Sequence, residues 1–276
     1  MIMIRPKIMG VLNITPDSFS DGNQFNSFES AVDQAKILSM TGADIIDVGG
    51  ESTRPGAMRV SVEEEQARVI PVIREIAKLG LAQISIDTMN SSTAREAVAA
   101  GARIINDVSG GLADPQMFKV AAELGVYLVI SHWRGHSTQM DSLNQYEDIA
   151  KDVSRELNER VELAIAQGVA REKIIIDPGL GFAKDMKQNW ELVARLDELE
   201  KLGLPILVGA SRKRFIAGVL DGDEPSTIGN ERRDIATAVL TALLLQRKLW
   251  GLRVHNTLAT SDAINIVAAL REASAE

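Results

Sequence analysis

The stretch AQISIDTMNSSTAREAVAAGARIIND, residues 82–107, decides the fold. It begins with the run AQISID and ends with the run ARIIND, and a helical pattern separates the two. Nearly continuous apolar runs of this length are typical of parallel strands that are covered on both faces. The stretch therefore predicts a strand, a helix and a second strand parallel to the first.

The same unit recurs along the whole chain. Six further runs of this kind are KIMGVL from Lys7, ADIIDVG from Ala43, VYLVIS from Val126, KIIID from Lys173, PILVGAS from Pro205 and LRVHN from Leu252. Amphipathic helices are expected between the runs, for example over 61–80 and 148–168, each ending at a glycine. Eight alternating units favour an α/β fold, a single (β/α)8 barrel of the TIM type, although a doubly wound open sheet also alternates in this way.

Length and composition bound the remaining choices. The 276 residues are close to the roughly 250 of one such barrel, and no low-complexity linker divides them, so one domain over residues 1–276 is expected. The net charge of -8 argues against general attraction to nucleic acid or to an anionic membrane. Cysteine is absent, which excludes disulfides and thiolate chemistry, and no run is long and apolar enough for a signal or a membrane span. A cytoplasmic location is expected.

Polar residues follow the predicted strands at one end, where active sites of barrel enzymes form. They are Asn13, Asp47, Asp87, Asn106, Asp107, Asp177, Ser211, Arg212, Lys213, Arg253 and His255. A wall of carboxylates and amides suits a ligand with several neighbouring N–H donors. Taken singly, Asp87, Asn106 or Asp177 could instead cap the helix that follows.

Two cations are placed where barrels often bind phosphate, after strands seven and eight. Lys213 and Arg253 would each need an anionic partner if buried, and a rim carboxylate is the alternative to a bound anion. His132 and His136 lack the spacing of a metal site, and His132 at a strand end is expected to be structural.

Several motifs resemble the dihydropteroate synthase family. They include MGVLNITPDSFSDG from Met9, ADIIDVGGESTRPGA from Ala43, ISIDT from Ile84, IINDVSGG from Ile104, IIDPGLGFAK from Ile175, LVGASRKRF from Leu207 and RVH from Arg253. The motifs GGESTRPGA and GASRKRF are the most specific, because a barrel does not require either. SHWRGHSTQM after strand five and Asn256 after RVH depart from the family's common pattern, so no substrate role is carried onto the first of these segments.

The resemblance implies a TIM-type barrel that acts as a transferase in folate biosynthesis. It would join 6-hydroxymethyl-7,8-dihydropterin diphosphate to p-aminobenzoate and release 7,8-dihydropteroate and pyrophosphate. Mg²⁺ is the implied cofactor, sulfonamides are implied inhibitors, and a homodimer is implied. Two alternatives stay open: a barrel that moves a methyl group from methyltetrahydrofolate, which the STRPGA and SRKRF loops disfavour, and a catalytically silent paralogue that binds pterin.

The resemblance also assigns residues. The pterin set is Asp87, Asn106, Asp177, Lys213 and Arg253, of which Asp87, Lys213 and Arg253 are the catalytic candidates. Asn13, Arg253 and His255 resemble the diphosphate contacts, with Asn13 also on magnesium, which uses few protein ligands. The p-aminobenzoate contacts would be Phe19, Thr53, Arg54, Pro55, Phe182 and Ser211. Asp47 resembles the acidic residue that organises the first two loops.

Overall fold

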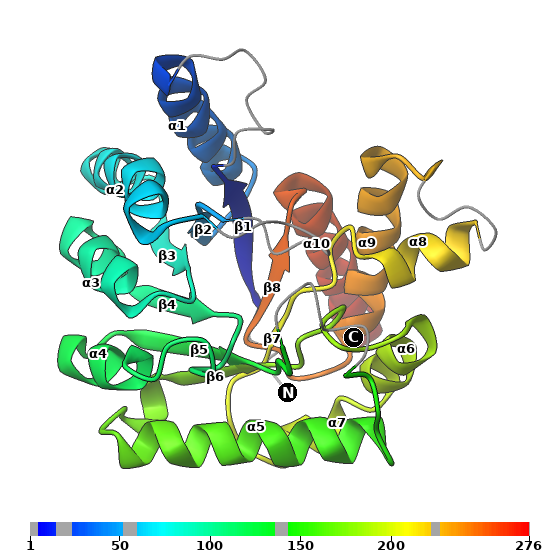
Figure 1. Ribbon diagram of the computed structural model, residues 1–276. Helices are drawn as coiled ribbons and strands as arrows, with labels where there is room; N and C mark the ends of the chain where they lie inside the picture. Colours follow the sequence, from blue (N-terminus) through cyan, green and yellow to red (C-terminus); the bar gives the residue numbers. More distant parts are fainter. Residues whose placement is uncertain (1–4, 15–23, 52–59, 136–142, 222–226, 276) are drawn as a thin grey trace.

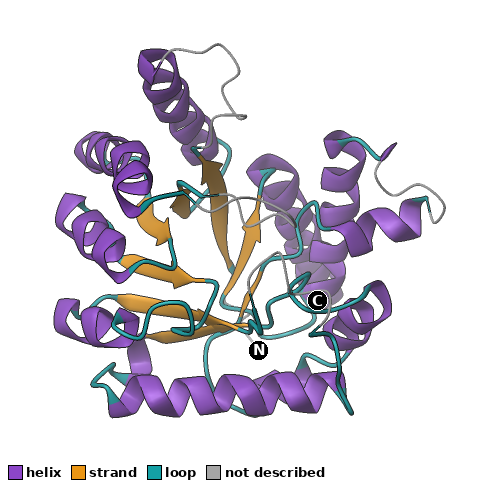
Figure 2. Cartoon of the chain, in the orientation of Figure 1, coloured by secondary structure: helices purple, strands orange, loops and turns teal. Residues whose placement is uncertain are grey.

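The computed structural model describes residues 5–14, 24–51, 60–135, 143–221 and 227–275, with the side chains of residues 24–27 and 275 left out. Strands and helices alternate within these ranges, as Figures 1 and 2 show, with the strands in the middle and the helices around them. The first half contains β1 (Lys7–Asn13), α1 (Gln24–Met40), β2 (Ile45–Gly49), α2 (Val62–Leu79), β3 (Gln83–Asp87), α3 (Ser91–Ala100), β4 (Ile104–Asp107), α4 (Met117–Leu124) and β5 (Tyr127–Ser131). The second half contains α5 (Ile149–Ala166), the short 3-10 turn η3 (Arg171–Lys173), β6 (Ile174–Asp177), α6 (Met186–Ala194), α7 (Asp197–Glu200), β7 (Leu207–Val208), α8 (Arg214–Leu220), α9 (Asn230–Leu244), β8 (Gly251–Val254) and α10 (Thr257–Ala275).

The eight strands form one parallel sheet that closes into a barrel. Their order is β6-β5-β4-β3-β2-β1-β8-β7, and a parallel bridge between Ile176 and Ile206 connects β6 to the segment before β7. This arrangement confirms all eight predicted strands and the TIM-type barrel, and it excludes the open sheet. The prediction that one domain takes in residues 1–276 stays a prediction.

Local sequence signals set the helix ends. Ser61 caps α2 by accepting a hydrogen bond from the Glu64 backbone, and Gly80 ends this helix at a φ of 63°. Asp148 caps α5 in the same way, but α5 ends at Ala166, two residues before the predicted glycine, with Gln167 as its C-cap. In the described residues, no helix is long and apolar enough to cross a membrane.

Apolar side chains fill both faces of the sheet. A large cluster lies between the strands and the helices, from Ile8 in β1 to Ile264 in α10. A smaller cluster fills the barrel interior with one residue from each of six strands: Met9, Ile45, Ile104, Val129, Ile175 and Leu207. This interior layer forms a closed floor, as expected for a barrel that is a packed core and not a pore.

Candidate active site

The inward-facing positions of the strands change from apolar to polar above this floor. Side chains two positions apart in a strand point to the same face. Asp47, Asn106 and Asp177 each follow a residue of the interior cluster by two positions, and all three are buried. The alternation of the strands therefore gathers the polar residues at one end of the barrel.

Arg253 lies at the centre of this polar layer. Its Nε donates to Oδ2 of Asp47 and its Nη2 donates to Oδ2 of Asp87, both at 2.6 Å. The same oxygen of Asp47 accepts from Nδ2 of Asn106 at 3.0 Å, while Oδ1 of Asp47 has no hydrogen-bond partner in the described part of the chain. The predicted alternative for a buried cation is thus observed for Arg253, which pairs with two rim carboxylates.

Asp47 is deeper than the sequence suggested. It is the middle residue of β2, fully buried, and its register partners are Val11 and Ser85, whereas Asp87 is level with Gly49 at the strand end. Its contacts are with Arg253 and Asn106. The loop-organising role of Asp47 stays a prediction, since the loop residues 52–59 lie outside the described ranges.

Two buried carboxylates share one guanidinium, and this shapes their acidity. Burial raises the pKa of Asp87 to about 7; Arg253 opposes the rise, and the carboxylate of Asp47 adds to it. Burial alone would lower the pKa of Arg253, but Asp47 and Asp87 together outweigh burial and raise it. Arg253 therefore stays charged, and Asp87 is the group that can take up a proton near neutral pH.

Asp177 and Lys213 form the second part of the site. Burial raises the pKa of Asp177 despite the nearby Lys213 and a 2.6 Å hydrogen bond from the Gly179 backbone. Burial lowers the pKa of Lys213 to about 8, against the attraction of Asp177. Nζ of Lys213 donates to the Leu180 carbonyl and lies 4.8 Å from the centroid of the Phe182 ring. A perturbed acid and a perturbed base thus face each other across the strand ends.

The helix-capping alternative is wrong for the three wall residues. The N-cap residues of α3, α4 and α6 are Asn90, Gln116 and Asp185. Asp87, Asn106 and Asp177 instead bond to Arg253, to Asp47 and to the Gly179 backbone, respectively.

The predicted diphosphate contacts lie at the rim. His255 Nδ1 is 3.0 Å from Oγ of Ser211, and the His255 backbone donates to the same oxygen at 3.2 Å. Asn13 is half-buried at the end of β1, and a Cβ built on Gly49 would lie 3.6 Å from its Oδ1, so the glycine leaves room beside that oxygen. Ser211 thus contacts His255 here, and its predicted contact with p-aminobenzoate stays a prediction.

The available protein ligands fit a magnesium ion that is coordinated mainly by the oxygens of a bound diphosphate. In the described ranges, no group of three or more His, Cys, Asp or Glu side chains could hold a metal. The neutral oxygen of Asn13 would be one protein ligand, which agrees with the preference of Mg²⁺ for a few protein ligands supplemented by phosphate oxygens and water.

Four predicted p-aminobenzoate contacts, Phe19, Thr53, Arg54 and Pro55, lie outside the described residues, and so does His136. His132 is described, and its Nδ1 and Nε2 lie 2.9 Å from Nζ of Lys184 and 3.0 Å from Oε2 of Glu156, respectively. These contacts confirm that His132 is structural.

Sequence reasoning missed Lys184. This residue is buried beside the site and bonded to backbone carbonyls of the turn that follows β6. The available signal was a lysine directly after the apolar run GLGFA, where a solvated side chain is not expected.

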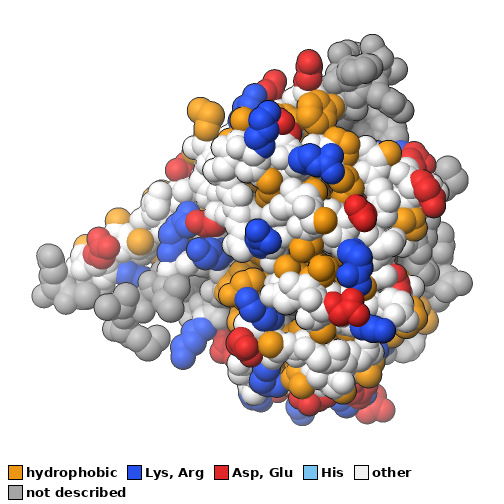
Figure 3. Space-filling model, turned by 90° about the vertical axis from the view of Figure 1, so that its left-hand side faces the viewer, with side chains coloured by type: hydrophobic (Ala, Val, Ile, Leu, Met, Phe, Trp, Pro, Cys, Tyr) orange, Lys and Arg blue, Asp and Glu red, His pale blue; other side chains and the backbone are white. Residues whose placement is uncertain are grey.

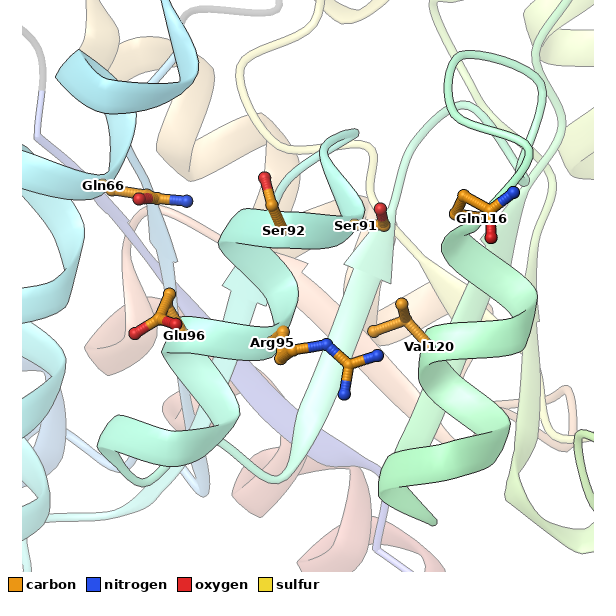
Figure 4. A pocket seen from close by; sticks show the side chains of 7 residues that line it. All are labelled: Gln66, Ser91, Ser92, Arg95, Glu96, Gln116 and Val120. Atoms are coloured by element: carbon orange, nitrogen blue, oxygen red, sulfur yellow. The ribbon is translucent and has the colours of Figure 1, made fainter.

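A shallow hollow of about 370 Å³ lies elsewhere, on the outer surface between helices. Figure 4 shows its lining side chains, which are Gln66, Ser91, Ser92, Arg95, Glu96, Gln116 and Val120. Basic and acidic side chains are interspersed on this side of the molecule, where α2, α3 and α4 lie (Figure 3). The hollow lacks the buried, charge-perturbed groups that mark the barrel mouth, so we place the active site at the mouth.

Comparisons with known proteins bear on the family of this chain. The pterin binding enzyme family matches residues 9–255. The dihydropteroate synthase of Mycobacterium leprae is 44% identical over 270 residues, covering 98% of this chain and 95% of the relative. A structure of the Xanthomonas albilineans dihydropteroate synthase with 4-aminobenzoic acid is 42% identical, with a TM-score of 0.88 and coverage of 97% of this chain and 93% of that one.

A third relative, the Yersinia pestis dihydropteroate synthase solved with a sulfonamide drug, is 36% identical, with a TM-score of 0.88 and coverage of 97% and 95%. The matched residues reach from β1 to β8 and include the polar groups of the barrel mouth. The chain therefore belongs to the pterin binding enzyme family and, within it, to the dihydropteroate synthases.

Proposed function

We propose that this chain joins 6-hydroxymethyl-7,8-dihydropterin diphosphate to p-aminobenzoate, giving 7,8-dihydropteroate and pyrophosphate. The observation that carries the proposal is one layer of polar residues above an apolar floor: the buried Asp87, Asn106 and Asp177 with the half-buried Lys213 and Arg253. Carboxylates accept parallel N–H bonds and an amide both donates and accepts, which matches the donor and acceptor edge of a pterin.

The reaction exchanges one bond for another at the exocyclic methylene of the pterin. The bond between this carbon and the diphosphate oxygen breaks, the amine nitrogen of p-aminobenzoate forms a bond to the carbon, and the amine loses a proton. Positive charge that develops on the pterin lies close to the carboxylates of Asp87 and Asp177, while Arg253 and Lys213 face the negative charge of the leaving group. Fixed charges in a buried site stabilise such a transition state without reorganisation. A covalent nucleophile is not needed.

Magnesium would be held by Asn13 together with diphosphate oxygens and would supply further charge neutralisation on the leaving group. His255, at the same rim, would contact the diphosphate. Sulfonamides are proposed to compete with p-aminobenzoate, on the basis of the drug-bound relative from Yersinia pestis. The cytoplasmic location stays a prediction.

We also propose a homodimer through α9 and α10. Ile235, Val239 and Leu243 are spaced four residues apart on α9 and are 58% to 60% exposed, so they form an apolar stripe. Ile266 and Leu270 are 69% and 67% exposed on the neighbouring α10. An exposed apolar patch on paired helices is typical of a protein interface. A Val239→Arg variant is expected to shift the mass in solution, measured by light scattering, from two chains to one, and an unchanged mass would contradict this interface.

A product assay tests the main proposal. The protein is incubated with the pterin diphosphate, p-aminobenzoate and magnesium, and dihydropteroate and pyrophosphate are followed together. Equal amounts of the two products are expected. Pterin binding without products would favour the silent paralogue, and the absence of both binding and products would contradict the proposal.

A further inference from the structure

The turn after β6 is built around one buried amino group, that of Lys184. Nζ of Lys184 lies 3.0 Å from the Gly179 carbonyl, 3.0 Å from the Phe182 carbonyl and 2.9 Å from Nδ1 of His132. An ammonium group has three N–H donors and no acceptor. Burial lowers the pKa of Lys184 well below its usual range. In either protonation state, its N–H donors face these acceptors and fix the positions of two carbonyl groups that are three residues apart.

The partner of Lys184, His132, directly follows β5 and is held in one orientation. Because Nδ1 of His132 accepts from Lys184, the ring proton is on Nε2, which donates to Oε2 of Glu156 at 3.0 Å. Arg134 fixes Glu156 in turn, through Nε at 3.0 Å and Nη2 at 2.5 Å. Burial, with Lys184 nearby, lowers the pKa of His132 to about 4, so the ring is neutral and can accept this bond at physiological pH.

The same turn carries parts of the site on its other side. The Gly179 backbone donates to Oδ1 of Asp177 at 2.6 Å, and the Leu180 carbonyl accepts from Lys213. A Cβ on Gly181 would lie 3.0 Å from Cδ of Lys213, and the Phe182 ring lies under the Lys213 ammonium. The conformation of residues 179–182 therefore determines where Lys213 stands relative to Asp177.

The backbone of this turn does not hold its shape by local preference alone. Ala183, next to Lys184, has a φ of 48°, in the left-handed region that residues other than glycine rarely adopt. Gly179 at a φ of 64° is so close to β5 that an added Cβ would clash with the His132 carbonyl. A strained segment of this kind persists only when surrounding contacts over-determine it.

We propose that Lys184, oriented by His132 and Glu156, is a positioning residue for the pterin site. It clamps the turn of residues 179–182 and thereby places Lys213, Asp177 and the Phe182 ring for the reaction. The expected effect on kcat/KM rests on the proposed function. The contacts that Lys184 makes with the turn are present without any substrate.

The test compares Lys184→Met with a matched control, Lys187→Met, in which the exposed lysine three residues later is replaced in the same way. The first readout is amide hydrogen exchange of residues 178–186 in the protein without substrate. Exchange in this segment is expected to speed up at least tenfold in Lys184→Met and to stay unchanged in Lys187→Met. Equal exchange in the two variants would overturn the clamp, whether or not the wild-type protein forms product.

The second readout is kinetic. Lys184→Met is expected to lower kcat/KM for the pterin diphosphate by about 10- to 100-fold, which corresponds to the loss of one to two charge-assisted contacts in the site. Faster exchange with unchanged kcat/KM would overturn the positioning role and leave only a structural one. Inactive wild-type protein would instead overturn the proposed function, and the exchange result would still decide the clamp.

A rescue experiment separates the ammonium group from general destabilisation. The chain has no cysteine, so Lys184→Cys offers a single thiol. Alkylating this thiol with 2-bromoethylamine in denaturant, followed by refolding, restores a side chain of lysine length that ends in an amine. Recovery of both slow exchange and kcat/KM is expected, and recovery of neither would overturn the proposal. Glu156→Gln serves as a second variant if Lys184→Met does not fold, because it only weakens the hydrogen bond to His132. Glu156→Gln is expected to speed up exchange and to lower kcat/KM by smaller factors than Lys184→Met. No change in either quantity would overturn the proposal.

Discussion

Replacing Asp47 by asparagine is expected to move the acid limb of the kcat/KM profile to lower pH. Ionised Asp87 is the form that can accept N–H bonds from the pterin, and burial raises its pKa to about 7. The nearby Asp47 carboxylate contributes to this rise because both carboxylates bind Arg253. Asparagine at position 47 keeps an oxygen for Arg253 and removes the negative charge, so Asp87 ionises more easily.

The size of the effect can be estimated for two carboxylates that bind one guanidinium. In the wild-type protein, kcat/KM for the pterin diphosphate is expected to fall about tenfold per pH unit below about pH 7, because this parameter reports the free enzyme. Two like charges about 5 Å apart at an effective dielectric constant of about 20 repel by about 3 kcal/mol. Such a change corresponds to a shift of the limb by about two pH units, toward about pH 5.

The assay is a kcat/KM profile from pH 5 to 9 with the pterin diphosphate as the varied substrate. The substrate's own titration is the same for every variant, so the difference between profiles isolates the protein. Asp33→Asn, which removes a carboxylate that is 69% exposed, is the matched control and is expected to leave the limb unchanged. A flat wild-type profile below pH 7, or an Asp47→Asn limb that stays in place or moves to higher pH, would refute the reasoning.

The remaining predictions concern the backbone conformation at two glycines, the apolar core and the ionisation of Asp87. Gly179→Ala and Gly80→Ala place alanine at nearly the same φ, 64° and 63°, but only the first added Cβ meets an atom within 4 Å, the His132 carbonyl. In urea unfolding, Gly80→Ala is expected to lower the free energy of unfolding by about 1 kcal/mol. Gly179→Ala is expected to lower it by more and to abolish pterin binding. Equal losses of unfolding free energy in the two variants would contradict this. Ile105→Ala, at a fully buried site, is expected to lower the free energy of unfolding by about 2 to 5 kcal/mol. Ile37→Ala, at a site 52% exposed, should change it by less than about 0.5 kcal/mol, and similar losses in the two variants would argue against the assigned core. The pKa of Asp87 is about 7 in the folded protein, which is higher than in the unfolded chain. Protonated Asp87 therefore stabilises the fold below about pH 4, and this contribution, up to about 4 kcal/mol, is lost as the pH rises to about 7. Asp87→Asn should abolish that slope in denaturation curves measured between pH 4 and 8, and an unchanged slope would show that another group causes it.

The sequence predicted the position of a side chain well where that position depends only on the residue's own strand. The apolar runs place Asn106 and Asp177 at strand ends on one rim, and in the structure both are buried there, two positions after residues of the interior cluster. The strand count follows equally well, because each run is long enough to be recognised alone.

Partner choice between strands was harder to predict. Arg253 could have paired with Asp177, but the register and depth of β2 bring Asp47 within 2.6 Å of it. Asp47 could not be placed at this depth from the sequence, since the apolar run does not reveal the residue at which the strand ends. Lys184 escaped notice for a related reason: its acceptors are two carbonyls of a tight turn and a histidine 52 residues earlier, and such contacts leave no periodic pattern.

The affinity of the pterin diphosphate, measured by titration calorimetry with magnesium and without p-aminobenzoate, tests most directly whether the pterin site lies at the barrel mouth. We expect one site per chain and a loss of affinity of about 10- to 100-fold in Lys213→Ala, which removes a charged contact at the barrel mouth. Arg95→Ala, in the outer hollow of Figure 4, should bind as the wild-type protein does. Full affinity in Lys213→Ala, or a comparable loss in Arg95→Ala, would contradict the placement of the pterin site.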